Sequence, residues 1–88
     1  MLFENVIKIL TKAKDENIDL LVAREKLIAN GYPSDEMTKA GDILRVYYKP
    51  IIKCWIAGNK DTINKICELY ESNKTEELKA LAEKIKGE

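Results

Sequence analysis

The chain has no histidine among its 88 residues, and this absence limits the chemistry that it can perform. Histidine is the commonest general base and the commonest zinc ligand, and it activates serine and cysteine nucleophiles. The two serines, Ser34 and Ser72, stand where helices need capping residues. The four glycines are isolated from one another, so no glycine-rich phosphate loop exists. These features predict a protein that is not an enzyme and that holds no metal and no cofactor.

The chain also lacks an excess of charge of either sign, because fifteen basic residues balance fifteen acidic ones. Nucleic-acid binding draws on a basic surface, so zero net charge counts against such a partner. The longest apolar run, over residues 46–57, is interrupted by Lys49 and Lys53 and cannot span a bilayer. An amphipathic pattern begins within the first residues, so we expect no signal peptide, no membrane contact and a cytoplasmic location.

Cysteine is scarce as well. Cys54 and Cys67 fall on apolar helix faces on either side of a predicted turn. In a helical hairpin the two cysteines would lie at similar positions along the helix axes, so a disulfide between them is the alternative. Because the cytoplasm keeps thiols reduced, two buried free thiols are the prediction.

Only two prolines and four glycines interrupt the chain, which favours helices over a β fold with many turns. Apolar residues recur at helical spacing over about 3–14, 18–30 and 35–57, then after the Gly58-Asn59 turn and after Thr75. We therefore predict an all-α fold, a compact bundle of four or five short helices that forms one domain over residues 1–88. The alternative at residues 15–17 is a first helix that continues without a break.

The segment 35–57 is predicted to be the centre of this bundle. Its apolar stripe keeps the same phase across Pro50, which predicts one helix kinked at that proline, with two separate helices as the alternative. The apolar arc is wide, so we expect Tyr47, Tyr48 and Trp55 to belong to the core, with their polar tips reaching its rim. Exposed rings would instead offer stacking platforms for single-stranded nucleic acid.

The helix over 18–30 carries two apolar strips separated by Arg24 and Glu25. One strip consists of Leu20, Ala23 and Leu27, and the other consists of Ile18, Leu21, Val22, Ile28 and Ala29. A helix that is apolar on two sides contacts two neighbours, or one neighbour and a partner. Arg24 and Val22 are therefore candidate contact residues.

A second candidate surface is the polar face of the segment 35–57, whose second half is purely basic. Arg45, Lys49 and Lys53 follow one another at helical spacing, with Val46 among them. Such a strip fits an acidic partner, and the ordinary alternative is a solvated face stabilised by ion pairs three or four residues apart. The candidate partner-binding residues are thus Arg45, Val46, Lys49, Lys53, Arg24 and Val22.

Without catalytic groups or cofactor motifs, the chain is expected to act by binding another macromolecule. The leading hypothesis is a small cytoplasmic protein-binding regulator, inhibitor or immunity-type protein that docks on a protein partner. The alternative is a nucleic-acid-binding transcriptional regulator, but Leu27 and Pro33 fit a helix-turn-helix poorly. A further alternative is a structural homodimer that buries the second strip of the helix over 18–30.

Overall fold

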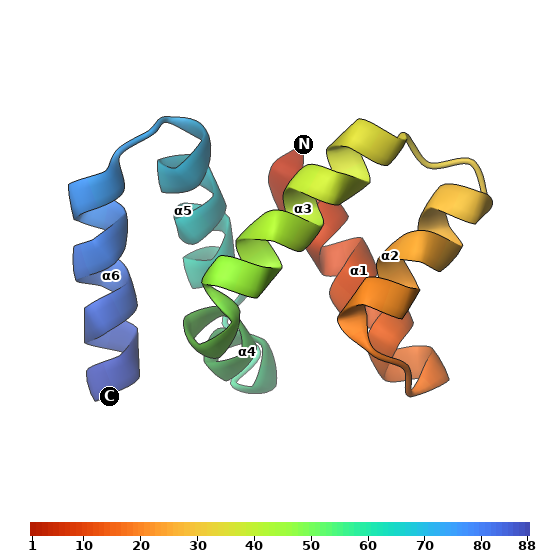
Figure 1. Ribbon diagram of the computed structural model, residues 1–88. Helices are drawn as coiled ribbons and strands as arrows, with labels where there is room; N and C mark the ends of the chain where they lie inside the picture. Colours follow the sequence, from red (N-terminus) through yellow and green to blue (C-terminus); the bar gives the residue numbers. More distant parts are fainter. The chain divides into compact units, whose positions relative to one another are not determined.

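The chain folds into six α-helices and no strand in the computed structural model, which describes residues 1–88 (Figure 1). The helices are α1 (Leu2–Glu16), α2 (Leu20–Ala29), α3 (Ser34–Val46), α4 (Tyr48–Ile56), α5 (Lys60–Glu71) and α6 (Thr75–Gly87). The predicted all-α class is confirmed. No helix combines the length and the apolar character that crossing a membrane requires.

The chain divides into two compact units, Met1–Leu44 and Arg45–Glu88. The first unit contains α1, α2 and most of α3, and the second contains the last two residues of α3 followed by α4, α5 and α6. The segment 35–57, which was predicted to be one helix at the centre of the bundle, therefore supplies residues to both units.

In the first unit, α1 and α2 pack side by side (Figure 1). The buried apolar residues are Leu2, Val6, Ile9 and Leu10 from α1, Ala23 and Leu27 from α2, and Met37, Ala40, Ile43 and Leu44 from α3. Glu16 at the end of α1 accepts a hydrogen bond from Lys26 Nζ at 2.8 Å and also pairs with Lys12. These two bonds lower the pKa of Glu16 below its ordinary value.

Arg24 of α2 lies across Gly41 of α3. A Cβ atom placed on Gly41 would come within 2.9 Å of Arg24 Cδ. The missing side chain of Gly41 therefore makes room for the aliphatic stem of Arg24 between the two helices.

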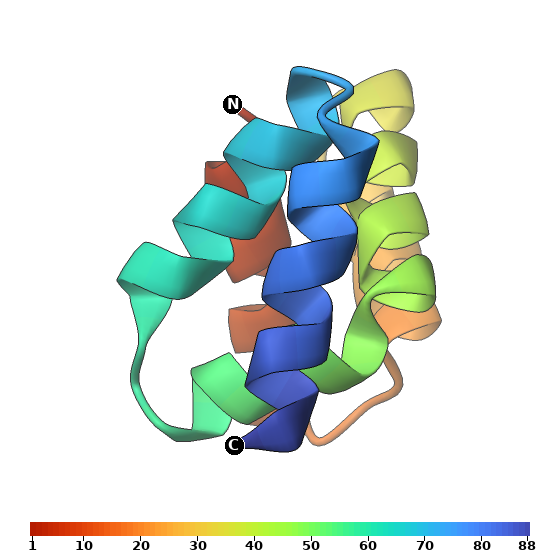
Figure 2. The ribbon, with the colours of Figure 1, turned by 90° about the vertical axis from the view of Figure 1, so that its left-hand side faces the viewer.

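In the second unit, α4 contacts both α5 and α6, and α5 packs against α6 (Figure 2). The buried residues are Pro50, Ile51 and Cys54 from α4, Ile63, Ile66, Cys67 and Leu69 from α5, and Leu78, Ala82 and Ile85 from α6. Lys53 Nζ donates a hydrogen bond of 2.7 Å to the carbonyl of Ile85, in the last turn of α6. The Glu88 amide also donates to this carbonyl, at 3.2 Å, so Lys53 adds a second hydrogen bond at the end of α6, where a cation complements the helix dipole.

Four connections between helices use a residue in the left-handed conformation. These residues are Asn17, Gly31, Gly58 and Asn73, with φ angles of 53°, 103°, 74° and 56°. In each case the next amide donates to a carbonyl five residues earlier: Ile18 to Ala13, Tyr32 to Leu27, Asn59 to Cys54 and Lys74 to Leu69. This is the Schellman pattern, which closes the end of a helix.

The predicted single helix over 35–57 is divided at Tyr47, so two helices are found, as in the alternative. Pro50 has no amide hydrogen to donate to the Val46 carbonyl, and its ring crowds that carbonyl. The chain leaves helical geometry at Tyr47, with φ −112° and ψ 33°, and α4 then begins at Tyr48. Pro50 thus falls in the first turn of α4, where helical amides need no partner. The chain consequently has six helices rather than four or five.

The prediction that Tyr47, Tyr48 and Trp55 belong to the core is wrong for Tyr48. Tyr48 is 48% exposed, while Tyr47 and Trp55 are half-buried. The wide apolar arc assumed one continuous helix, whereas the chain leaves helical geometry at Tyr47. Within α4 the buried face consists of Pro50, Ile51 and Cys54, so the aromatic residues fall outside it.

Candidate functional site

An open groove of about 420 Å³ lies in the second unit, between the start of α4 and α6. Its lining residues are Arg45, Val46, Tyr47, Tyr48, Lys49 and Pro50 on one side and Lys79, Ala82, Glu83 and Lys86 on the other. We call it the α4–α6 groove. It brings together three of the predicted contact residues, Arg45, Val46 and Lys49.

Helical spacing explains why α6 presents this set of residues. Lys79, Ala82, Glu83 and Lys86 follow one another at intervals of three, one and three residues, which places them on a single face of a helix. Ala82 is buried, whereas the three charged residues are exposed. The groove therefore combines an apolar base with charged edges.

The break at Tyr47 shapes the opposite wall. The residues on either side of it, Val46 and Tyr48, are 61% and 48% exposed. Tyr47 itself packs edge-to-face against Tyr70 of α5, with ring centroids 6.4 Å apart. Pro50 is buried beneath this wall. The site thus presents two large exposed side chains above a packed base.

The charge of the groove is strongly unbalanced, although the whole chain is neutral. Four of its lining residues are cationic, Arg45, Lys49, Lys79 and Lys86, and one, Glu83, is anionic. Lys86 Nζ lies 3.9 Å from Glu83 Oε1, and the exposed fractions of these side chains are 49% and 76%. An ion pair this exposed contributes little, roughly 0–1 kcal/mol, so it leaves the positive character of the groove in place.

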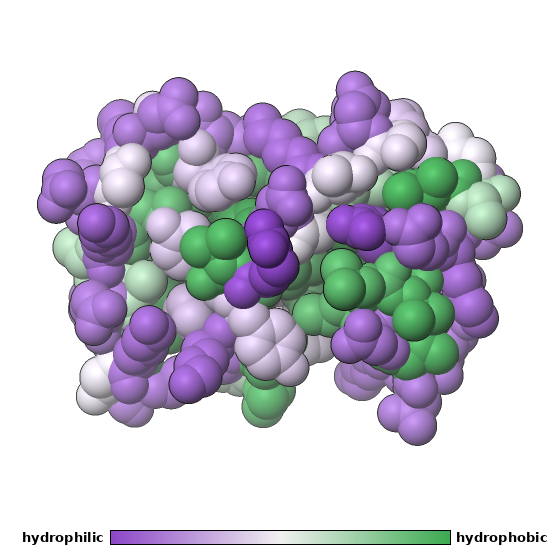
Figure 3. All heavy atoms as spheres, viewed as in Figure 1, coloured by the Kyte–Doolittle hydropathy of each residue, from purple (hydrophilic) through white to green (hydrophobic).

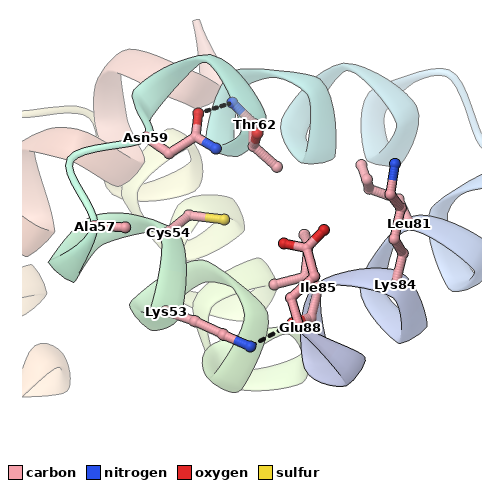
Figure 4. A pocket seen from close by; sticks show the side chains of 9 residues that line it. All are labelled: Lys53, Cys54, Ala57, Asn59, Thr62, Leu81, Lys84, Ile85 and Glu88. Carbon is pink, nitrogen blue, oxygen red and sulfur yellow. Dashed lines mark hydrogen bonds between the residues drawn. The ribbon is translucent and has the colours of Figure 1, made fainter.

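Lys53, also predicted as a contact residue, does not line this groove. Its bond to Ile85 directs it into a second cavity of about 190 Å³, shared with Cys54 and Glu88 (Figure 4). Asn59 and Thr62 also line this cavity, and the Asn59 side chain accepts a hydrogen bond from the Thr62 amide and caps α5. The predicted strip of Arg45, Lys49 and Lys53 is thus divided between two sites.

Arg24 and Val22 lie on α2 in the first unit. Arg24 Nη2 is 2.9 Å from Glu25 Oε1, and its stem covers Gly41, so Arg24 is held within the unit. Val22 is 45% exposed and Leu21 is 50% exposed. Figure 3 shows a hydrophobic patch over α2. Ala23 and Leu27 are buried on one side of α2, and Leu21 and Val22 are exposed on the other. This arrangement agrees with the two apolar strips in the sequence.

Cys54 and Cys67 are free and buried, as predicted. Burial raises the pKa of the Cys67 thiol to about 12, and the nearby Glu71 and Glu68 act in the same direction. Burial, followed by the charge of Glu88, also raises the pKa of Cys54. Both thiols therefore stay protonated near neutral pH and are poor nucleophiles. No group of three or more cysteine or acidic side chains is arranged to hold a metal ion.

Lys79 and Lys86 are groove residues that the sequence did not single out. On sequence alone they belong to the solvated face of the last helix, and only the packing of α4 against α6 places them opposite Lys49. Comparison with known protein families, curated proteins and solved structures found no match to this chain.

Proposed function

We propose that the chain is a small, non-enzymatic protein-binding regulator, of the inhibitor or immunity type, that docks on a protein partner through the α4–α6 groove. The observation that carries this proposal is the position of Arg45, Val46 and Lys49 in one groove, with Val46 and Tyr48 exposed at its edge. Exposed apolar and aromatic side chains beside a concave surface are typical of interaction sites.

The nucleic-acid alternative has less support. Binding of single strands uses a series of aromatic faces open to the bases. Here Tyr47 already packs against Tyr70, and the Lys60 ammonium lies 5.9 Å from the centroid of the Trp55 ring. Zero net charge also provides little general attraction for phosphates.

The cytoplasmic location remains part of the proposal. The two free thiols support it, because reducing compartments favour unpaired cysteines. The exposed Leu21 and Val22 favour a second candidate function, a homodimer that pairs two copies through α2. Light scattering over a range of concentrations distinguishes this candidate, since a mass that stays monomeric would contradict it.

Two exposed valines provide a matched test of the main proposal. Val46→Ser removes the apolar contact at the groove, whereas Val22→Ser makes the same change on α2. We expect wild type and Val22→Ser to capture the same protein from a lysate of the source cells, as identified by mass spectrometry, and Val46→Ser to lose it. Thermal unfolding monitored by circular dichroism should be similar for all three proteins, because both positions are exposed. Equal capture by Val46→Ser would contradict the proposal.

A further inference from the structure

We propose that the α4–α6 groove recognises an acidic segment of its protein partner, in which two carboxylates about 10 Å apart flank one apolar side chain. This inference rests on the proposed function and specifies the chemistry of the partner. Three features of the groove lead to it: the spacing of its lysines, the position of Glu83, and the apolar base.

The spacing of the carboxylates follows from α6. Lys79 and Lys86 are seven residues apart, which corresponds to about 10 Å along the helix axis. Lys49 faces them from the wall formed by the start of α4. A partner carboxylate near each lysine of α6 would replace solvent with a charge-assisted hydrogen bond. At Lys86 it would compete with the exposed pair to Glu83, whose 3.9 Å separation makes it a weak competitor.

Glu83 determines what lies between those two carboxylates. It stands between Lys79 and Lys86 on the same helix face, next to the buried Ala82. A third carboxylate of the partner would be repelled at this point, whereas an apolar side chain could contact Ala82, Pro50 and the exposed Val46. The groove therefore selects the order acid, apolar, acid.

The size of the groove suits a peptide segment. Its volume of about 420 Å³ falls within the usual range of binding pockets, roughly 300–1,000 Å³. One peptide conformation matches the spacing of the lysines and keeps both acids on the same face: a helix with acids seven residues apart, about 10 Å along its axis. An extended strand with acids three residues apart would cover a similar distance, but its two carboxylates would point to opposite faces.

The experiment is a selection from a displayed library of short random peptides, with the full-length protein as bait. The test bait is the Lys79→Glu/Lys86→Glu double variant. The control bait is Lys14→Glu/Lys65→Glu, which changes the net charge equally at exposed positions outside the groove. Peptides selected on wild type are then synthesised, labelled and titrated by fluorescence anisotropy at low and physiological salt.

We expect the selected peptides to be acidic with a central apolar residue. Their affinity should fall about tenfold or more for the test variant and less than about twofold for the control. It should also weaken with added salt, because the lysines are exposed. Circular dichroism confirms that each variant is folded.

The other outcomes separate the two proposals. Neutral peptides that are lost on Val46→Ser would overturn the acidic inference and leave protein docking at the groove intact. Failure to select any peptide sensitive to Val46→Ser would overturn both proposals. Tighter binding of a short oligothymidine than of the selected peptides, lost on the same lysine reversals, would show that the groove recognises phosphates instead.

Discussion

At the residue scale, burial of the Cys67 thiol links stability to alkaline pH. Cys67 is only 1% exposed, and its pKa rises from the ordinary 9.0 to about 12 in the folded protein. Because folding raises this pKa, the protonated thiol makes its full contribution to the stability of the folded protein below pH 9. That contribution then declines as the pH rises from 9 towards 12, because only the unfolded chain ionises there.

We therefore expect the melting temperature of wild type to fall more steeply with pH above 9 than that of Cys67→Ala. The variant starts from a lower melting temperature because it leaves a small cavity, so the comparison concerns the slopes. Tyrosine and lysine ionise in both proteins, and the difference between the slopes isolates Cys67. Circular dichroism melts at several pH values provide the measurement, and parallel slopes would contradict the assignment.

At the element scale, Pro50 separates α3 from α4. Replacing it with alanine restores an amide that can bond to the Val46 carbonyl, and it removes the ring that crowds this carbonyl. We expect Pro50→Ala to extend helical geometry through Tyr47 and to weaken binding at the α4–α6 groove, because Val46 and Tyr48 would change direction.

Backbone carbon chemical shifts from NMR measure this effect directly. Tyr47 should move from a non-helical to a helical shift in the variant, while Gly58, at the far end of α4, should stay left-handed. An unchanged shift at Tyr47 would mean that contacts other than the proline hold the break.

The sequence predicts the glycine-terminated helix ends better than it predicts the break between α3 and α4. Gly31 and Gly58 end helices through local conformational preference, which is visible in a few consecutive residues. The break at Tyr47 was less visible, because the apolar stripe continues in phase across it and the responsible residue lies three positions later. For a short amphipathic helix, local pattern cannot decide which of several apolar residues is buried, as the exposed Tyr48 shows.

The candidate site was predictable only in part for the same reason. Arg45, Val46 and Lys49 are close in sequence and remain close in space. Lys79 and Lys86 join them through the packing of α4 against α6, which local periodicity does not encode. Conversely, Lys53 continues the basic spacing but donates its hydrogen bond to the end of α6.

At the scale of the whole molecule, the boundary between the two units falls inside α3 rather than in a loop. The second unit begins at Arg45, and Arg45 and Val46 are the last two residues of α3. Helical geometry at these residues depends on hydrogen bonds to carbonyls four residues earlier in the chain. The groove wall that they form therefore depends on residues before Arg45.

We expect a fragment of residues 45–88 to bind the selected acidic peptides at least about tenfold more weakly than the full chain, because its groove wall loses the preceding helical turn. Anisotropy titration of the full chain and the fragment measures this difference. A second fragment that begins at Ser34 restores all of α3 and serves as the control. Equal affinity of the shorter fragment and the full chain would contradict the expectation.

The left-handed helix ends have a further consequence for adaptability. In four of the five connections between helices, a left-handed residue is followed by an amide that donates a hydrogen bond back across the turn. The connection from α3 to α4 contains no left-handed residue, and it forms one wall of the groove. We expect any backbone change that accompanies partner binding to be concentrated in this connection. The most adaptable part of the backbone would then be the part that contacts the partner.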